Sequence, residues 1–192
     1  MNINDVPEVA RLERAIFSDP WSEKVYEETL MLEDVAYLVV ISTCDEMRCK
    51  CDETGRRIDP EDSASMGGAE LNNTYAQIKD GAEINEKCCK NGSEADSIIG
   101  VCGVRNILGD GEITNVMVLP EYRKRNIATR MLEELLEEGK KLGARDFTLE
   151  VRSKNAAAIH LYEKLGFKIE GIRKGYYEHP KEDALIMWKR NA

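Results

Sequence analysis

Apolar residues spaced three or four apart predict four helices in this chain. The longest covers residues 127–142, where the apolar positions form one stripe and the opposite face is charged. Shorter helices are expected over residues 5–17, 22–32 and 155–165. Asp5 and Ser22 are the expected N-caps of the first two helices, and Gly143 is expected to end the longest one.

Apolar runs of strand length predict the strands of a sheet. The runs at residues 36–41 and 98–104 are continuous, which is typical of strands covered on both faces. Residues 147–152 alternate between apolar and polar, so one face of that strand is expected to be polar. Further strands are expected over residues 112–118, 168–172 and 184–188, with a turn at 109–111 and a loop over 176–183.

This order of elements predicts the α/β fold class. Two helices precede an antiparallel meander, a helical crossover follows, and a strand, a helix and two closing strands come last. A mixed, mostly antiparallel central sheet flanked by helices accommodates that order. The chain is expected to form a single domain over residues 1–192.

Residues 42–97 depart from this pattern. The stretch carries 13 acidic and seven basic residues, few large apolar side chains and repeated turn sequences. It buries too little apolar area to offset the entropy of ordering itself, unless a metal or a partner helps. We therefore expect a polar insertion in the loop of a hairpin, flexible or only locally ordered.

The insertion holds five of the six cysteines, which are Cys44, Cys49, Cys51, Cys88 and Cys89. C-x4-C-x-C followed by a distant C-C is not a standard zinc spacing, although four thiolates could converge. An even count also fits disulfides, but a cytosolic protein disfavours them. We expect reduced cysteines and no metal site, with Cys102 a small buried side chain in its strand.

The chain is acidic, with 27 basic and 36 acidic side chains and a net charge of −9. This charge disfavours general nucleic-acid binding, because attraction to phosphate supplies most non-specific affinity, and it suits a basic or amine-bearing partner. No stretch approaches the roughly 18 apolar residues of a membrane span, and the N-terminus lacks a signal-peptide pattern. We expect a soluble, cytoplasmic protein with no direct nucleic-acid or membrane partner.

Val116–Thr129, with the sequence VMVLPEYRKRNIAT, is the most informative stretch for chemistry. A strand is expected to end there, a short loop carries Arg123, Lys124 and Arg125, and a helix begins near Asn126. The N–H groups and dipole at a helix start bind phosphate, and asparagine tolerates a left-handed backbone. Three neighbouring cations in an acidic chain indicate a site for a polyanionic ligand. The alternative is a basic turn that is merely solvated.

Residues 123–128, RKRNIA, resemble the acetyl-CoA loop Q/R-x-x-G-x-G/A of the GNAT acetyltransferase superfamily. LEVRSKNAAAIHLYEKLGF at residues 149–167, and EDALIMWK further on, are similar to the ribosomal-protein-alanine N-acetyltransferases of that superfamily. DVPEVARLERAIFSDPWSEKVY upstream is similar to their first helix and the loop after it. The resemblance covers nearly all of the chain outside residues 42–97 and implies a GNAT-like fold and acetyl-CoA as co-substrate.

The resemblance also implies catalytic roles. Acetyl transfer to an amine requires a neutral nucleophile and a proton for the departing thiolate. Glu150 matches the family's general base and Tyr162 its general acid. Taken alone, Glu150 fits a surface glutamate on an edge strand, and Tyr162 fits an ordinary core tyrosine.

Binding residues follow from the same resemblance. Acetyl-CoA is expected to contact Val116, Met117, Val118, Arg123, Lys124, Arg125, Asn126, Ile127, Ala128, Thr129 and Asn155, the first three through main-chain groups. Trp21, Tyr176 and Tyr177 match positions that flank the family's peptide cleft, although these aromatic residues fit equally well as a cover over the core.

The implied reaction is transfer of an acetyl group to a protein N-terminus by direct attack, with the N-terminal alanine of small-subunit ribosomal protein eighteen as acceptor. Another amine, such as a polyamine, a lysine side chain or a small antibiotic, is an alternative, as is a non-catalytic module that binds acetyl-CoA or metal. Three features depart from the family pattern. Asn126 replaces the first loop glycine, residues 42–97 are inserted, and only residues 1–4 precede the first helix where the family has a strand.

Overall fold

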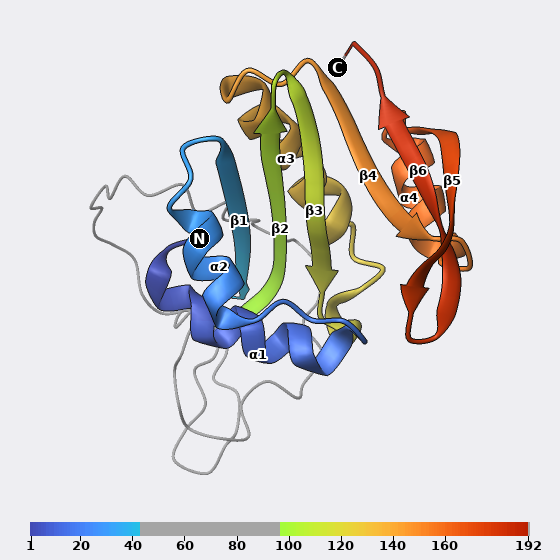
Figure 1. Cartoon of the computed structure of the whole chain (residues 1–192). Coiled ribbons are helices and arrows are strands. Elements are labelled where there is room, and N and C mark those ends of the chain that lie inside the picture. The colour runs from blue at the N-terminus through green and yellow to red at the C-terminus, as the bar shows by residue number, and fades with distance from the viewer. Residues whose placement is uncertain (43–96, 192) are drawn as a thin grey trace, which may run out of the picture.

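The computed structural model of the chain describes residues 1–42 and 97–191. Within these ranges it contains helices on both faces of one six-stranded sheet (Figure 1). The helices are α1 (Val6–Ile16), α2 (Glu23–Leu30), α3 (Ile127–Lys141) and α4 (Ala156–Lys164), with 3-10 turns at Ile3–Asp5 and Pro120–Tyr122. The strands are β1 (Val35–Ser42), β2 (Ser97–Ile107), β3 (Asp110–Val118), β4 (Asp146–Arg152), β5 (Lys168–Glu178) and β6 (Lys181–Lys189). The predicted α/β fold class is confirmed.

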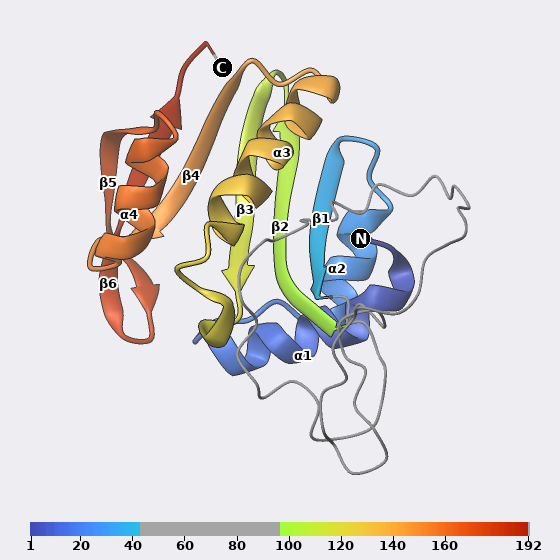
Figure 2. The ribbon, with the colours of Figure 1, turned by 180° about the vertical axis from the view of Figure 1, so that it is seen from behind.

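The strands lie in the order β1-β2-β3-β4-β6-β5. β3 and β4 run parallel and are joined by the crossover helix α3, whereas all other neighbours pair antiparallel. The sheet is therefore mixed and mostly antiparallel, as predicted. α3 and α4 lie on one face of the sheet (Figure 2), and α1 and α2 lie on the other.

Two apolar clusters fill the two faces of the sheet around β1–β3. β1 contributes to both, because Leu38 and Val40 pack in the cluster with α3, whereas Tyr37 and Val39 pack in the cluster with α1 and α2. In β2, residues 98–104 are all buried. The prediction that these two continuous apolar runs are strands covered on both faces is confirmed.

Local sequence sets the ends of several elements. Ser22 caps α2 by accepting the Val25 N–H at 3.4 Å, and Gly143 follows α3 with a φ of +94°. Asp5 precedes α1, but its carboxylate accepts the Asn2 N–H at 2.7 Å and makes no cap hydrogen bond to that helix. Asp5 is thus the N-cap residue of α1, as predicted, but its carboxylate closes the preceding 3-10 turn instead of capping α1.

The turn between β2 and β3 lies earlier than predicted. Leu108 and Gly109 form it with φ values of +56° and +103°, whereas Asp110 and Gly111 already belong to β3. A leucine with a positive φ is uncommon, so the prediction followed the two glycines and ended the turn at residue 111, two residues too late.

The closing hairpin is longer than predicted. β5 continues to Glu178 and β6 begins at Lys181, so most of the loop expected over residues 176–183 is strand. β5 is an edge strand whose residues are almost all exposed, and it therefore lacks the apolar alternation from which strands are predicted.

Ser42 at the end of β1 pairs with Ser97 at the start of β2. The insertion expected over residues 42–97 thus lies in the connection of a hairpin, as predicted, while residues 43–96 lie outside the described residues. No helix in the described part of the chain is long and apolar enough to cross a membrane.

Candidate active site

β3 and β4 part where the predicted catalytic residues lie. Their parallel register ends at Ile113↔Leu149. Beyond that pair, β3 continues through Val116–Val118 beside β2, and β4 continues through Glu150 beside β6, so the two strands diverge toward their ends (Figure 1). The β3 backbone groups that face β4 over Val116–Val118 therefore lack a β4 partner. The Val118 carbonyl accepts from Arg123 Nε instead, and the other groups could bind a ligand.

The two predicted catalytic side chains lie on opposite faces of the sheet. Phe147, Leu149 and Val151 of β4 are buried in the cluster with α3 and α4. Because side chains alternate along a strand, Glu150 projects from the other face. Tyr162 on α4 belongs to the cluster with Leu149, so it lies on the α3 and α4 side.

Glu150 is held by groups from β5. Its carboxylate accepts a short hydrogen bond from Nη1 of Arg173, and its side chain is 26% exposed. Hydrogen bonding to Glu150 raises the pKa of the Tyr176 hydroxyl above its usual value. Arg173 also lies over the Tyr176 ring, 4.7 Å from its centroid. The carboxylate thus has an ordered environment and keeps access to solvent.

A bulge in β5 aims these groups at Glu150. Between Arg173 and Tyr177 the pairing with β6 shifts, so that three residues of β5 stand opposite Asp183 alone. Within the bulge, Gly175 has a φ of +61° and donates its N–H to Asp183 Oδ1 at 2.7 Å. Bulges re-aim the side chains next to them, which here are those of Arg173 and Tyr176.

Tyr162 has the protonation state that a general acid needs. It is 7% exposed, and its ring meets Phe167 edge to face with 6.0 Å between centroids. Burial raises the pKa of its hydroxyl, and Cys102 of β2 and Tyr177 of β5 raise it further. The hydroxyl therefore holds its proton across the neutral range, and its predicted role as a proton donor stays a prediction.

The loop before α3 has the backbone of an anion-binding turn. Lys124 and Asn126 are both left-handed, with φ values of +63° and +58°. Asn126 is the N-cap residue but makes no side-chain cap hydrogen bond. The first-turn N–H groups of Ile127, Ala128 and Thr129 are thus not capped by its side chain, and a phosphate oxygen could accept from them.

The basic side chains of this loop divide into two kinds. Arg123 donates from Nε to the Val118 carbonyl at 3.0 Å and ties the loop to the end of β3. Arg125 lies over the Tyr122 ring at 5.3 Å, and both Lys124 and Arg125 are exposed. The loop therefore presents positive charge at the start of α3, next to the strand end at which β3 and β4 have parted.

Asn155 caps α4, with Oδ1 accepting the Ala158 N–H at 3.2 Å. This capping role was not predicted from the sequence. Because the oxygen is occupied, the expected contact of Asn155 with acetyl-CoA would come from the amide nitrogen, and it stays a prediction.

The predicted acceptor-binding aromatic residues lie in two segments that the fold brings together. Tyr176 and Tyr177 pack edge to face in β5, with 5.0 Å between ring centroids. Trp21 lies half-buried in the loop between α1 and α2. Arg152 of β4 joins the segments, since it contacts both Asp19 in that loop and the ring of Tyr177.

A buried polar cluster anchors the Trp21 loop. Glu13 of α1 is 2% exposed and accepts the Trp21 N–H at 2.6 Å and an N–H of the Asn115 amide at 3.2 Å. The Asn115 amide also donates to the Tyr26 hydroxyl at 2.6 Å, and burial together with Glu13 raises the pKa of Tyr26. The loop is thereby fixed to α1, α2 and β3.

Arg152, Arg173 and Glu13 were missed as candidates by the sequence analysis. The only signal for Arg152 was its place two residues after Glu150 on the polar face of a predicted strand. Arg173 and Glu13 carried no signal, because their partners come from elements far away in the chain.

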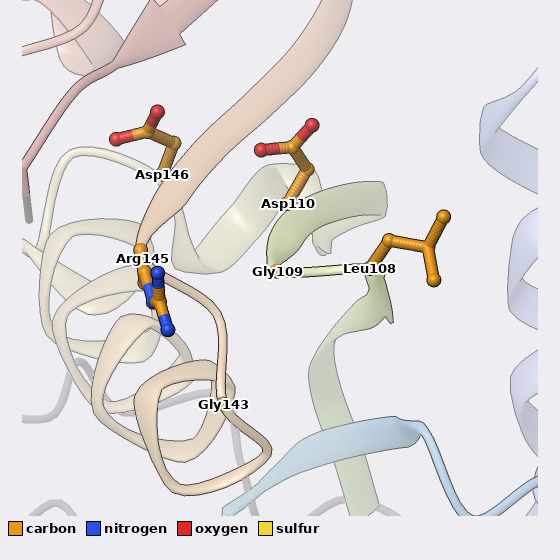
Figure 3. A pocket seen from close by; sticks show the side chains of 6 residues that line it. All are labelled: Leu108, Gly109, Asp110, Gly143, Arg145 and Asp146. Carbon is orange, nitrogen blue, oxygen red and sulfur yellow. The ribbon is translucent and has the colours of Figure 1, made fainter.

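A polar pocket lies at the other end of β3 and β4 (Figure 3). It is lined by Leu108, Gly109, Asp110, Gly143, Arg145 and Asp146. These residues come from the β2–β3 turn and from the connection between α3 and β4, at the starts of the two parallel strands. The pocket includes none of the predicted site residues, which gather at the strand ends.

The described residues contain no group of three or more His, Cys, Asp or Glu side chains that could hold a metal ion. Cys102 is fully buried, as predicted, and burial raises the pKa of its thiol. The five cysteines of the insertion lie outside the described residues, so the expectation about them stays a prediction.

Comparisons with known proteins agree with this geometry. A sequence profile of the acetyltransferase (GNAT) family matches residues 57–167, more than half of the chain. A putative [ribosomal protein bS18]-alanine N-acetyltransferase of Bacillus subtilis is 42% identical over 91 residues, which cover 47% of this chain and 60% of that protein. The [ribosomal protein bS18]-alanine N-acetyltransferase of Escherichia coli is 36% identical over 116 residues, which cover 59% of this chain and 76% of that protein.

A solved structure shares the fold. The crystal structure of the ribosomal-protein-S18-alanine N-acetyltransferase from Escherichia coli matches with a TM-score of 0.64 and 24% identity, covering 100% of this chain and 91% of that one.

Proposed function

Because the chain belongs to the acetyltransferase (GNAT) family, we propose that it transfers the acetyl group of acetyl-CoA to the α-amine of a protein N-terminus. The acceptor that we propose is the N-terminal alanine of ribosomal protein bS18. The two relatives that carry this activity in their names support the choice of acceptor. The negative charge of the chain suits a basic ribosomal-protein tail, through steering of the encounter.

One structural observation carries the proposal. The β3–β4 register ends at Ile113↔Leu149, and the next residue of β4 is Glu150. Past that pair, Glu150 lies on one face of the sheet and Tyr162 on the other, so a ligand that reaches between the strand ends would have a carboxylate on one side and a protonated phenol on the other.

The residues fit acetyl-CoA by their chemistry. The left-handed turn at Lys124 and Asn126, with the exposed cations beside it, suits a pyrophosphate. The β3 backbone at Val116–Val118 suits an extended amide chain and a carbonyl, to which it can donate hydrogen bonds. Bound acetyl-CoA supplies an acyl thioester that an amine can attack.

Glu150 and Tyr162 handle the protons of this transfer. Glu150 accepts a proton from the acceptor ammonium, directly or through water, and leaves a neutral amine. As the new C–N bond forms and the C–S bond breaks, Tyr162 gives its proton to the departing sulfur. The attacking nitrogen then loses its second proton to water, and the Tyr162 phenolate regains a proton from solvent. Arg173 occupies the Glu150 carboxylate in this structure, so the incoming ammonium has to compete with that guanidinium.

The experiment is a choice among acceptors. We would measure thiol release from acetyl-CoA with three acceptors: a short peptide that begins with the N-terminal alanine of bS18, spermidine, and a peptide with a blocked N-terminus and one lysine. Selective turnover of the alanine peptide is the expected result. Turnover of spermidine or of the lysine peptide alone would overturn the proposed acceptor, and no turnover with any amine would overturn the proposed activity.

A further inference from the structure

Arg152 of β4 has contacts with several residues from other segments of the chain. Nη2 donates to Ser18 Oγ at 2.7 Å, to the His179 carbonyl at 3.1 Å and to Asp19 Oδ2 at 3.3 Å, and Nη1 donates to the Pro180 carbonyl at 3.2 Å. Its guanidinium also lies 4.1 Å from the centroid of the Tyr177 ring. We call this set of contacts the Arg152 clasp.

The buried carboxylate of Glu182 holds the Arg152 guanidinium in place. The Glu182 side chain is 6% exposed and lies 3.6 Å from Arg152 Nη1. Glu182 itself is held, since it accepts the Lys154 N–H at 2.6 Å and the Ser153 hydroxyl at 3.3 Å. An arginine that is held in this way, with a ring on one face and a planar fork of donors, has little freedom, and a lysine cannot reproduce its geometry.

The clasp joins two segments on the face from which Glu150 projects. Ser18 and Asp19 belong to the loop that carries Trp21, and His179 and Pro180 form the tip of the β5–β6 hairpin. Arg152 lies two residues after Glu150, so both side chains point to that same face. Tyr176 and Tyr177 lie on the β5 arm of the hairpin, so the clasp connects both groups of predicted acceptor-binding aromatic residues.

We propose that Arg152 is a positioning residue for the acceptor, which holds the α1–α2 loop against the β5–β6 hairpin so that the two segments bind the peptide N-terminus as one rigid site. This inference rests on the proposed function for its identification of the acceptor site. The residue touches neither the acetyl-CoA loop nor the β3 strand end in any described contact, so its effect is confined to the acceptor.

The first test is Arg152→Met, which keeps the length of the side chain and removes the fork. The KM for the alanine peptide should rise by at least roughly tenfold, because small displacements of positioning groups have large effects. The KM for acetyl-CoA should change less than about twofold. Arg152→Lys should recover only part of the loss. An unchanged peptide KM in Arg152→Met would overturn the proposal.

Arg190 offers a matched control at the opposite end of β4. It forms ion pairs with Asp146 at 3.2 Å and Glu170 at 2.8 Å, and it lies 3.7 Å from the centroid of the Trp188 ring. Arg190→Met therefore removes the same kinds of contact far from the acceptor site. It should leave both KM values unchanged, and a rise in peptide KM equal to that of Arg152→Met would overturn the proposal.

Asp19→Ala opens the clasp from the loop side without disturbing the buried Glu182 pair. The Asp19 side chain is 51% exposed, so this variant should fold normally. Asp19 also lies 3.6 Å from Nδ1 of His179 at the hairpin tip. If the clasp is the cause, Asp19→Ala should therefore raise the peptide KM in the wild-type background and have a clearly smaller effect in the Arg152→Met background, where only the His179 contact remains. Additive effects of the two substitutions would contradict the clasp.

Hydrogen exchange tests the clasp without any acceptor. The amides of the non-proline residues in 17–21 and 178–181 should exchange faster in Arg152→Met than in wild type, while those of Arg190→Met should match wild type in these segments. If wild type acetylates none of the peptides, the proposed function fails, and this exchange pattern still decides whether the clasp holds the two segments. Unchanged exchange in Arg152→Met would overturn the clasp itself.

Discussion

β2 and β5 are strands of equal length in the same sheet with opposite surroundings. Both contain 11 residues. In β2, residues 98–104 are buried without exception, whereas in β5 every residue except Gly171 and Tyr177 is exposed. β2 lies between β1 and β3 and between two apolar clusters, whereas β5 forms the edge of the sheet.

The comparison indicates that β2 contributes mainly to stability, whereas β5 contributes mainly to the candidate site. β2 can be apolar over residues 98–104 because both of its faces are packed there, and charges at those positions would lose their hydration. β5 keeps its charged side chains in water, where Arg173 and Tyr176 can be aimed at Glu150. The strand that contributes least to the core therefore supplies the groups that surround the candidate base.

We call the two apolar clusters the buried half of the molecule, and we call β5 together with the side chains that it contacts, such as Glu150, the exposed half. The largest effect is expected at Glu150. Glu150→Gln should lower kcat by about 10²- to 10⁴-fold, the usual contribution of a general base. Glutamine has the same shape and can still accept from Arg173, so the contact between β4 and β5 is kept while proton acceptance is lost. Steady-state turnover of the alanine peptide measures this effect, and full activity would sink the assigned mechanism.

Glu170→Gln is the control for that substitution. Glu170 also lies in the exposed half and pairs with an arginine, Arg190, at 2.8 Å. Its removal should leave kcat unchanged within about twofold, since surface ion pairs contribute little. A large loss of kcat in Glu170→Gln would mean that any change of charge in the exposed half lowers kcat. The loss of kcat in Glu150→Gln would then be no evidence that Glu150 is the general base.

The buried half should dominate stability. Leu132 is fully buried under the sheet, whereas Ile172 of β5 is 60% exposed. Leu132→Ala should lower the free energy of unfolding by about 3 kcal/mol, through lost burial and a residual cavity. Ile172→Ala should cost less than about 0.5 kcal/mol. Urea denaturation of the two variants measures this difference, and equal losses would break the comparison between the halves.

Tyr162 combines features of both halves, because it is buried on α4 and is also the proposed general acid. Tyr162→Phe should lower kcat by up to about 10²-fold while acetyl-CoA binding is kept. Tyr37→Phe, at a buried tyrosine of the other cluster, is the control and should leave kcat unchanged.

The pH dependence of Tyr162 has a definite sign. The hydroxyl acts in its protonated form, and burial raises its pKa above the ordinary value near 10. Ionisation of Tyr162 should therefore not reduce kcat between pH 7 and about 10, and loss should come only as pH rises beyond the raised pKa. A decline of kcat near neutral pH that disappears in Tyr162→Phe would contradict this assignment.

The buried half was the easier one to predict from sequence. The continuous apolar runs of β1 and β2 and the alternation of β4 follow directly from which faces are covered. The edge strand β5 was predicted too short, because its exposed residues carry no apolar pattern. The place of β6 between β4 and β5 depends on pairing between distant segments, for which the local sequence holds no signal.

The candidate site was predictable only as far as its parts are local. The left-handed conformation suited to Asn126 could be inferred from the residue type, and the structure has it. The contacts of Arg173 and Arg152 could not be inferred, because they require the bulge at Gly175 and the meeting of a loop with a hairpin tip. Roles can thus be assigned to residues from a motif, whereas the groups that hold those residues emerge only from the fold.

The smallest effect is expected at Asn126, in the loop that we propose binds acetyl-CoA. Asn126 has a φ of +58° at the N-cap of α3, a conformation that costs most non-glycine residues about 1–2 kcal/mol. Asn126→Ala should therefore lower the free energy of unfolding by about 1 kcal/mol and weaken acetyl-CoA binding by about fivefold, whereas Asn126→Gly should stay near wild type. Urea denaturation and calorimetric titration with acetyl-CoA measure the two quantities. If alanine matched asparagine in both, the left-handed turn would not be what organises the loop, and the basic side chains alone would have to account for binding.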